Sequence, residues 1–424
     1  MNRCVLLLAL MPFSSPPAAR AGELPRAEPA AVGLSAARLD ALGPALAKLV
    51  DDGQVAGGVV LIARHGQVAL VVPFGYRDLA ARAPMAEDAI FAIASMTKPI
   101  TCVAAMTLVE RGKLRLEDPV ADHLPELKGL RVLGDIKEDT PEGPATVPAS
   151  RPITIRDLLT HTSGFAYGGF LSSDPRLGRA YDRAGVQARG LRTIAEQVGR
   201  LAGVPLAHQP GERWTYGLSH DVLGRVIEVA SGRPLDEYLR ETIFSPLDMR
   251  DTSFLVPEAD RGRLATVYRA GLLGGKLTPL PIGPGSATLF SGGGGLYSTA
   301  RDYARFAEML RAGGELEGVR ILKPETIAAM TTNQIGGKNA LLLFKYGLGF
   351  GLVMAPGPDG KPAPARFFWG GIFSTNFWVD RRDDTVAVVM TQVLPTNHGG
   401  VDRIVRRAVE AAVEDGPKPE GRVR

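Results

Sequence analysis

Residues 90–109 read IFAIASMTKPITCVAAMTLV and contain the only Ser-x-x-Lys pattern of the chain, from Ser95 to Lys98. The apolar run before Ser95 is typical of a strand, and the run over residues 100–111 predicts a helix. Residues three apart share one face of a helix, so the Lys98 ammonium would reach the Ser95 hydroxyl. A serine at a helix start also has an unpaired backbone N–H and the positive end of the helix dipole beside it, which suits an oxyanion. Taken alone, the same pattern also describes a serine cap followed by a surface lysine.

Strand patterns lie at both ends of the chain. Residues 55–72 predict two strands joined by a tight turn at His65 and Gly66. β-Branched and aromatic runs between residues 346 and 391, separated by Gly, Pro and Asp, predict a meander of antiparallel strands. Apolar residues at helical spacing over residues 401–413 predict a final amphipathic helix that packs on this sheet.

The middle of the chain has mostly helical patterns. Thr154 with Asp157, and Thr299 with Asp302, form the T-x-x-D signature of a capped helix start. Residues 134–152 are rich in Pro, Glu and Asp and predict a surface loop. We therefore expect an α/β fold of the α+β type, in which helices flank an antiparallel sheet built from both chain ends and a mainly helical domain is inserted.

The expected domain boundaries follow from these patterns. They are a signal peptide at residues 1–21, a sheet domain at residues 22–94 and 340–424, and a helical domain at residues 95–339. The signal peptide is predicted because a short apolar run follows Arg3 and small residues precede a cleavage site after Ala21. The protein is therefore expected to be periplasmic or secreted.

The composition is that of a globular protein. Its 424 residues are 45% hydrophobic and 22% charged, and the net charge of +4 is spread along the chain, so no basic cluster indicates a nucleic-acid partner. No apolar run approaches the ~20 residues that span a bilayer. Removal of Cys4 with the signal would leave Cys102 alone as a small core residue, so no disulfide is expected. The His and Cys residues lack zinc spacing and the phosphate-binding glycine motifs are missing, so neither a metal nor another cofactor is expected.

Five motifs occur in a fixed order, and they are SMTK at 95–98, LLTHTSGF at 158–165, PGE at 210–212 leading to Tyr216, SGGGGL at 291–296 and WGG at 369–371. The set resembles the serine β-lactamase superfamily, which has the fold of class C β-lactamases and penicillin-binding proteins, over roughly residues 30–412. Within this superfamily the chain is most similar to the family VIII carboxylesterases. The resemblance implies the same two-part architecture that the strand and helix patterns predict.

The resemblance implies catalytic roles for three side chains. Ser95 would be the nucleophile, Lys98 its proton acceptor, and Tyr216 the second base and later the acid. In this Ser-Lys form of nucleophilic catalysis, a desolvated lysine with a lowered pKa does the work of a histidine. The alternative for Tyr216 is a half-buried core aromatic beside Trp214.

The same resemblance implies the groups that bind the substrate. The backbone N–H groups of Ser95 and Ile372 would form the oxyanion hole. One side of the cleft would be a strand that contains Trp369, Gly370 and Gly371. The two glycines would let the backbone approach a bound carbonyl group closely.

Two departures from the superfamily pattern indicate the substrate. Penicillin-recognising members carry Tyr-x-Asn where residues 216–218 read YGL, and Lys-Thr-Gly where residues 369–371 read WGG. The cation and hydroxyl that would bind a substrate carboxylate are thus replaced by an indole and a hydrogen atom. Trp369 offers an apolar wall instead, which suits the acyl or alcohol group of an ester. No G-x-S-x-G elbow is present, which separates this chain from the α/β-hydrolases.

These features predict an exported serine hydrolase, a carboxylesterase that cleaves neutral esters through an acyl-Ser95 intermediate. The expected partner is a small-molecule ester, and the oligomeric state stays open. A β-lactamase or D,D-peptidase of the same fold is the first alternative, with Arg366 as the replacement cation. An acyltransferase, an amide hydrolase and a catalytically inactive binding protein also remain open. Residues 161–163 are interpreted as the end and cap of a helix rather than as catalytic.

Overall fold

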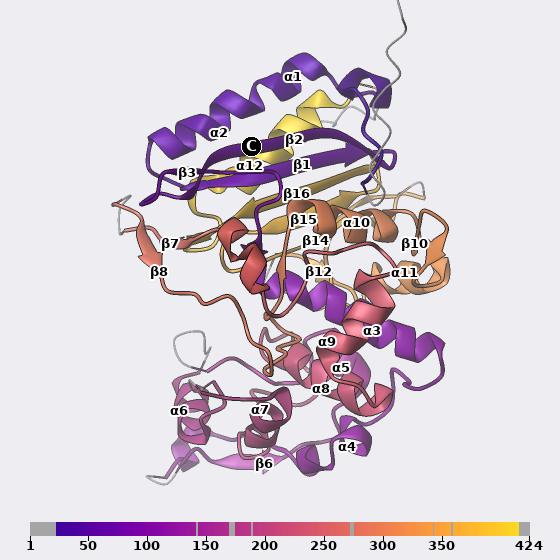
Figure 1. Cartoon of the computed structure of the whole chain (residues 1–424). Helices are drawn as coiled ribbons and strands as arrows, with labels where there is room; N and C mark the ends of the chain where they lie inside the picture. The colour runs from indigo at the N-terminus through magenta and orange to yellow at the C-terminus, as the bar shows by residue number, and fades with distance from the viewer. Residues whose placement is uncertain are drawn as a thin grey trace, which may run out of the picture.

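An eight-stranded antiparallel sheet lies in the upper half of the view in Figure 1. The structure is a computed structural model, and it describes residues 23–140, 143–168, 174–187, 190–271, 275–341, 343–357 and 359–414. The expected signal peptide, residues 1–21, lies outside these ranges. Helices pack on both faces of the sheet, and a mainly helical lobe occupies the lower half of the view.

The sheet joins the two ends of the chain. Its strands, in spatial order, are β12 (Lys345–Tyr346), β13 (Gly351–Pro356), β14 (Pro362–Gly370), β15 (Asn376–Asp380), β16 (Thr385–Thr391), β1 (Gly57–Arg64), β2 (Gln67–Asp78) and β3 (Ala83–Pro84). β1 pairs with β16, with Gly58 opposite Thr391. The expected α+β fold, with an antiparallel sheet built from both chain ends, is therefore confirmed.

Both faces of the sheet are buried, because successive side chains of a strand point to opposite faces and all eight residues of β1 are buried. Val59 and Leu61 of β1 belong to the larger core on one face, and Val60 and Ile62 belong to a second core on the other face. The second core is covered by α1 (Ala36–Asp40), α2 (Leu42–Asp51) and α12 (Val401–Ala412) (Figure 1). On the larger core, α10 (Ala300–Arg311) packs against β1, β15 and β16.

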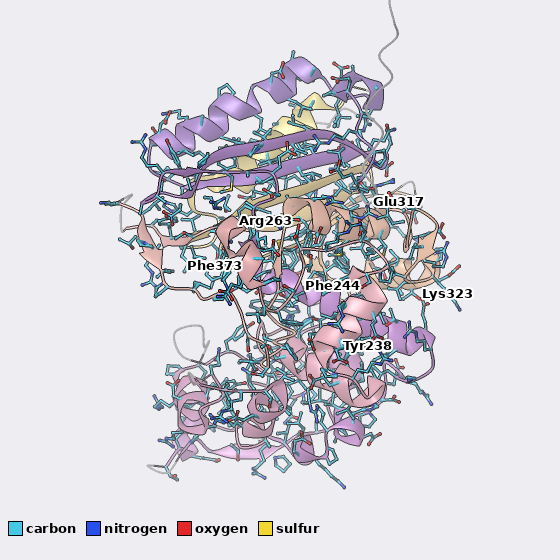
Figure 2. All side chains as sticks on the ribbon, viewed as in Figure 1. Tyr238, Phe244, Arg263, Glu317, Lys323 and Phe373 are labelled. Carbon is cyan, nitrogen blue, oxygen red and sulfur yellow. The ribbon has the colours of Figure 1, made fainter. Side chains whose placement is uncertain are left out.

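The helix α3 (Thr97–Glu110) joins the sheet to the helical lobe. It is buried on nearly all sides, as its apolar sequence requires, and the buried Cys102 lies within it as expected. Its Thr107 hydroxyl lies 2.8 Å from the hydroxyl of Tyr238, which Figure 2 labels in the helical lobe. Pro99 lies in the first turn of α3, where N–H groups have no partner within the helix, so the proline is tolerated there.

The helical lobe holds most of the remaining elements. They are α4 (Val120–His123), α5 (Ile155–Leu159), α6 (Pro175–Ala184), α7 (Ile194–Leu201), α8 (Ser219–Ser231), α9 (Leu235–Leu239), β5 (Arg131–Leu133) and β6 (Thr146–Pro148). The loop predicted over residues 134–152 is wrong in one part, because β6 pairs with β5 as a hairpin. Thr154 and Asp157 form the predicted capping box of α5.

The remaining described strands and one further helix are short. They are β4 (Phe91–Ala92), β7 (Val267–Arg269), β8 (Thr278–Leu280), β9 (Tyr297–Ser298), β10 (Glu315–Leu316), β11 (Val319–Arg320), β17 (Val393–Leu394) and α11 (Pro324–Met330). β4 pairs with β9, and the predicted cap Thr299 follows β9 and starts α10. α10 packs on the sheet although it falls in the range expected for the helical domain, and the domain boundaries stay a prediction.

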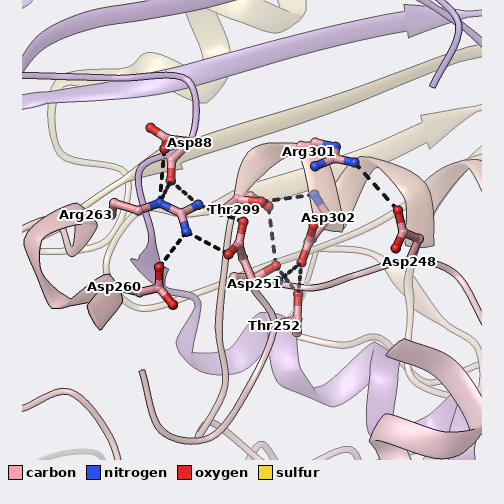
Figure 3. A network of polar contacts seen from close by, with 10 residues as sticks. Asp88, Asp248, Asp251, Thr252, Asp260, Arg263, Thr299, Arg301 and Asp302 are labelled. Carbon is pink, nitrogen blue, oxygen red and sulfur yellow. Dashed lines mark hydrogen bonds and ion pairs between the residues drawn. The ribbon is translucent and has the colours of Figure 1, made fainter. Parts of the chain in front are cut away.

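A network of ion pairs around Arg263 holds the segment that leads into the Ser-x-x-Lys motif (Figure 3). The guanidinium donates to both carboxylate oxygens of Asp251, at 2.8 and 2.7 Å, and to Asp260 at 3.1 Å. It also contacts the Asp88 carboxylate at 3.1 Å and donates to the Asp88 carbonyl oxygen. The backbone N–H of Ile90 donates to the carbonyl of Arg263, and β4 begins with the next residue. Arg263 therefore anchors β4 to the chain segment before β7.

Replacing Arg263 by Met is expected to lower the free energy of unfolding by about 1–3 kcal/mol, because the Asp251 and Asp88 carboxylates then lose a charged partner. Urea denaturation followed by circular dichroism measures this change. Arg115→Met is the control, since that side chain is 80% exposed and lies 3.9 Å from Asp118. Its expected effect stays within about 0.5 kcal/mol. Equal losses in the two variants would contradict the anchoring role.

Candidate active site

Ser95 lies at the junction of β4 and α3, in a short helical turn over Ala94–Met96. Ala94 has a φ of +45°, a left-handed conformation that costs a residue with a side chain about 1–2 kcal/mol. Backbone strain of this kind is concentrated at functional sites. Within the described part of the chain, the N–H of Ser95 donates no hydrogen bond, so it can bind a ligand.

Lys98 places a fully buried ammonium group beside Ser95. Its Nζ donates to the Ser95 hydroxyl oxygen at 3.1 Å, to the Tyr167 hydroxyl oxygen at 3.1 Å, and to the carbonyl oxygen of Gly293. A lysine ammonium has three hydrogens, and each of them therefore has an acceptor. The expected contact between Ser95 and Lys98 is present.

Two tyrosines flank Lys98, and they contact it in different ways. Tyr167 offers its hydroxyl, whereas Tyr216 offers the face of its ring, whose centroid lies 4.8 Å from Nζ. The two rings lie 5.5 Å apart. Tyr216 was predicted from the sequence, whereas Tyr167 was not, although Tyr167 follows the LLTHTSGF motif by only two residues. Its distance of 69 residues from Lys98 along the chain gave no sign of the contact.

The glycine-rich motif at 291–296 forms a wall of the site. Asp221, buried at the start of α8, accepts hydrogen bonds from the Ser291 hydroxyl and from the N–H of Gly293 at 3.2 Å. These bonds turn the carbonyl of Gly293 toward Lys98. Any Cβ atom at Gly293 would overlap the Asp221 carboxylate, so glycine is required there. Asp221 belongs to none of the five sequence motifs.

The surroundings of Lys98 raise its pKa. Burial by itself lowers the pKa of the ammonium group, but the oxygens of Tyr167 and Tyr216 and the carboxylate of Asp221 outweigh burial. The lowered pKa expected for this lysine is therefore wrong. The physical reason is the set of oxygen acceptors around the ammonium, and these come from segments outside the Ser-x-x-Lys motif.

The raised pKa of Lys98 leads to a prediction for the pH dependence of ester hydrolysis. Lys98 can take the Ser95 proton only as a neutral amine, which is scarce below its pKa, so kcat/KM is expected to rise about tenfold per pH unit without a plateau below pH ~9. A pH-rate profile measures this, with spontaneous hydrolysis subtracted by a Ser95→Ala sample. A plateau at neutral pH would show that the proton acceptor has a much lower pKa.

The turn between β14 and β15 brings the WGG motif against the residues before Ser95. The Thr375 hydroxyl donates to the carbonyl oxygen of Ile93 at 3.2 Å, and a Cβ atom at Gly371 would overlap that same carbonyl. A Cβ atom at Gly370 would meet the side chain of Asn376, so both glycines allow close approach. Among the described residues, the N–H of Ile372 donates no hydrogen bond. Both expected oxyanion-hole donors are therefore unpaired, on segments that touch.

Trp369 belongs to an aromatic cluster beside Tyr216. Its ring centroid lies 5.7 Å from that of Tyr216 and 5.2 Å from that of Tyr346, and the side chain is 5% exposed. Arg366, the replacement cation considered from the sequence, is buried in ion pairs with Asp380 at 3.0 Å and Glu410 at 2.8 Å. Arg366 is thus already paired with two carboxylates, so its role as the replacement cation gains no support from the structure, and the β-lactamase alternative itself stays open.

Other kinds of site have less support. In the described ranges, no group of three or more His, Cys, Asp and Glu side chains is arranged to hold a metal ion. None of the described helices combines the length and apolar character needed to cross a membrane. Ser163, in the segment interpreted as a helix cap, is fully buried and its hydroxyl lies 2.9 Å from that of Ser219.

A family model described as Beta-lactamase matches residues 44–412. The chain belongs to the Beta-lactamase family. Esterase EstB of Burkholderia gladioli is 35% identical to this family member over 374 residues, which cover 82% of this chain and 87% of EstB. Lovastatin esterase of Penicillium rubens is 30% identical over 382 residues, which cover 82% of this chain and 92% of that enzyme.

A solved structure supports the same assignment. The structure of EstCE1, described as a hydrolase with promiscuous acyltransferase activity, matches this Beta-lactamase family member with a TM-score of 0.72 at 27% identity. The match covers 88% of this chain and 98% of EstCE1. The resemblance to the serine β-lactamase superfamily, and within it to the family VIII esterases, is confirmed. The protein is an enzyme of this superfamily, a hydrolase with the β-lactamase fold.

Proposed function

We propose that the protein is a carboxylesterase that cleaves neutral esters through an acyl-Ser95 intermediate. One observation carries this proposal. The Ser95–Lys98 pair lies directly beside an aromatic wall formed by Tyr216 and Trp369. In the described part of the site, Lys98 is the cation that contacts the rings of Tyr167 and Tyr216, and its three hydrogens have acceptors in the protein. A substrate carboxylate would therefore lack a charged partner, whereas a neutral ester needs none.

The residues divide the reaction as follows. The Ser95 oxygen attacks the ester carbonyl carbon while the Lys98 amine takes the Ser95 proton, and the N–H groups of Ser95 and Ile372 bind the oxyanion. The bond to the alcohol oxygen then breaks, and Tyr216 gives that oxygen a proton, which Lys98 replaces. Water attacks the acyl-serine and passes a proton to the same pair, and Ser95 regains its proton when the acid leaves. Tyr167 holds Lys98 in place through its hydroxyl.

The names of the relatives support an ester substrate, because two of them are called esterases and EstCE1 is called a hydrolase with acyltransferase activity. Acyl transfer is the second candidate, since an acyl-serine gives its acyl group to whichever nucleophile enters the cleft. We also propose that the protein is exported, with cleavage after Ala21, from the pattern of residues 1–21. Mass spectrometry of the N-terminus of the mature protein tests this.

Comparison of two substrates tests the proposed esterase. kcat/KM for p-nitrophenyl butyrate is expected to exceed that for a chromogenic cephalosporin by at least ~10²-fold, because an unpaired carboxylate near an apolar ring costs about 1–3 kcal/mol or more. Adding butanol to the same assay and measuring butyl butyrate separates acyl transfer from hydrolysis. Comparable efficiency on both substrates would favour the β-lactamase alternative.

Replacing Trp369 by Lys and Gly370 by Thr is expected to reduce the ratio of kcat/KM for the butyrate ester to that for the cephalosporin. The ester loses part of its apolar wall, and the cephalosporin carboxylate gains a cation and a hydroxyl. The Asn376 side chain must shift to admit a Cβ atom at position 370. Trp369→Phe is the matched control, because it keeps an apolar ring and adds no charge. An unchanged ratio in the double variant would show that the substrate does not contact this strand.

A further inference from the structure

Two of the six histidines, His161 and His208, contact residues 214–216, which include the proposed catalytic tyrosine, and His220 packs on His161. His161 and His220 are fully buried, and His208 is 2% exposed. His161 belongs to the LLTHTSGF motif, which the proposed reaction does not use. A role for these buried imidazoles therefore has to come from the residues that they contact.

The His161 ring lies at the centre of the aromatic cluster. Its centroid is 4.9 Å from that of Tyr216, 5.4 Å from that of Trp214 and 4.3 Å from that of His220. None of the four ring nitrogens of His161 and His220 has a hydrogen-bond partner among the described residues. Burying polar atoms in this way is unfavourable, and a phenylalanine ring would fill the same space without that cost. Packing alone therefore does not explain an imidazole at position 161.

The backbone of His161 also holds the segment before Tyr216. Its φ is +57°, a left-handed conformation in which histidine, like Asn and Asp, is found several times more often than most side chains. In this conformation its carbonyl oxygen accepts the N–H of Thr215 at 2.8 Å. Thr215 immediately precedes Tyr216. Histidine is thus the aromatic side chain suited both to the left-handed backbone and to a ring contact with Tyr216.

His208 holds the same residue from another direction. Its Nδ1 lies 2.8 Å from the carbonyl oxygen of Gln209, an acceptor, so Nδ1 carries the proton. The other nitrogen, Nε2, therefore accepts the Thr215 hydroxyl at 2.8 Å. Thr215 is fixed by its backbone and by its side chain, and the ring that follows it rests on His161.

We propose that His161 is a positioning residue that acts through Tyr216, and that it fixes the Tyr216 ring beneath the Lys98 ammonium by the ring contact and by the backbone bond to Thr215. This inference rests on the proposed function, because it concerns the efficiency of the same site. A residue that only stabilised the fold would not act selectively through one catalytic side chain.

Two substitutions separate the two halves of the proposed role. His161→Asn keeps a side chain that accepts the left-handed backbone and removes the ring, whereas His161→Phe keeps a ring and loses the backbone preference. Both are expected to lower kcat for p-nitrophenyl butyrate at least about tenfold and to leave KM within about threefold, since proton transfer and not substrate binding is disturbed. The matched control is Val405→Ala, a fully buried position of α12 in the second core, where a loss of thermal stability should leave kcat unchanged.

A double-mutant cycle decides whether His161 acts through Tyr216. In a Tyr216→Phe background, adding His161→Asn is expected to lower kcat by less than about twofold. The reason is that the Tyr216 hydroxyl, which His161 positions, is already missing. The same fold-loss in both backgrounds would overturn the proposal, and so would full activity of both His161 variants. If one variant does not fold, the cycle is run with the other.

A second measurement keeps this inference distinct from the proposed function. The rate at which a fluorophosphonate labels Ser95 reports its deprotonation without any ester turnover. If the unmutated protein is labelled but cleaves no ester, the proposed function is wrong, and the cycle is then measured on the labelling rates. Equal labelling rates together with equal ester kcat for His161→Asn and the unmutated protein would overturn the positioning role.

Discussion

Ser95→Ala is expected to lower kcat/KM for p-nitrophenyl butyrate by on the order of 10⁴ or more, because a nucleophile that works as a unit with its base accounts for most of the rate enhancement. The site is preorganised around the Ser95 oxygen. This oxygen accepts a hydrogen bond from Lys98, and Ser95 directly follows the strained residue Ala94. Steady-state assays on purified protein measure the loss. Ser231→Ala, near the exposed end of α8, is the control that should retain full activity.

The same assignment predicts which serine a phosphonate modifies. A p-nitrophenyl phosphonate is expected to give a single adduct on Ser95, located by peptide mass spectrometry. The competing serines are less suited to attack, since Ser163 is fully buried and the Ser291 hydroxyl donates a hydrogen bond to the Asp221 carboxylate. An adduct on Ser163 or Ser291 with Ser95 unmodified would overturn the assignment.

The sheet was predictable from the sequence because its signals are local. The runs over residues 55–72 and 346–391 show strand composition and turn residues without reference to the rest of the chain, and they became β1, β2 and β12 to β16. The caps at Thr154 and Thr299 likewise depend on residues only three positions away. The hairpin of β5 and β6 was missed because its strands are short and lie among loop-forming residues.

The candidate site was predictable only where its residues share a motif. Ser95 and Lys98 lie one helical turn apart, so their contact follows from helix geometry. The acceptor at Gly293 lies 195 residues from Lys98, and Tyr167 and Asp221 come from other segments of the helical lobe. These distant oxygens decide the direction of the pKa shift of Lys98. The prediction of a lowered Lys98 pKa considered only the desolvation of this one side chain, and it was therefore wrong in direction.

Lys98→Ala and Tyr216→Phe are each expected to lower kcat by at least about 10²–10⁴-fold, the usual scale of general acid-base catalysis. The double variant is expected to be little worse than the more severe single variant, because the two residues form one proton-transfer unit. Kinetic assays on the three variants measure this, with circular dichroism to confirm that each has folded. Losses that multiply would show that the residues act independently.

Tyr167→Phe distinguishes the two tyrosines, since it removes a hydroxyl that raises the pKa of Lys98 while it leaves the Tyr216 ring in place. Because the pKa of Lys98 then falls, its neutral amine form is present at lower pH, and the rise of kcat/KM with pH is expected to shift toward lower pH. The effect on kcat at high pH should be smaller than that of Tyr216→Phe, which removes the proton donor of the leaving alcohol. A pH profile that stays in place, with a loss as large as that of Tyr216→Phe, would instead assign the proton-donor role to Tyr167. In that case the proton would pass between Lys98 and Tyr167 along their 3.1 Å contact, and this contact would not serve only to hold the ammonium in place.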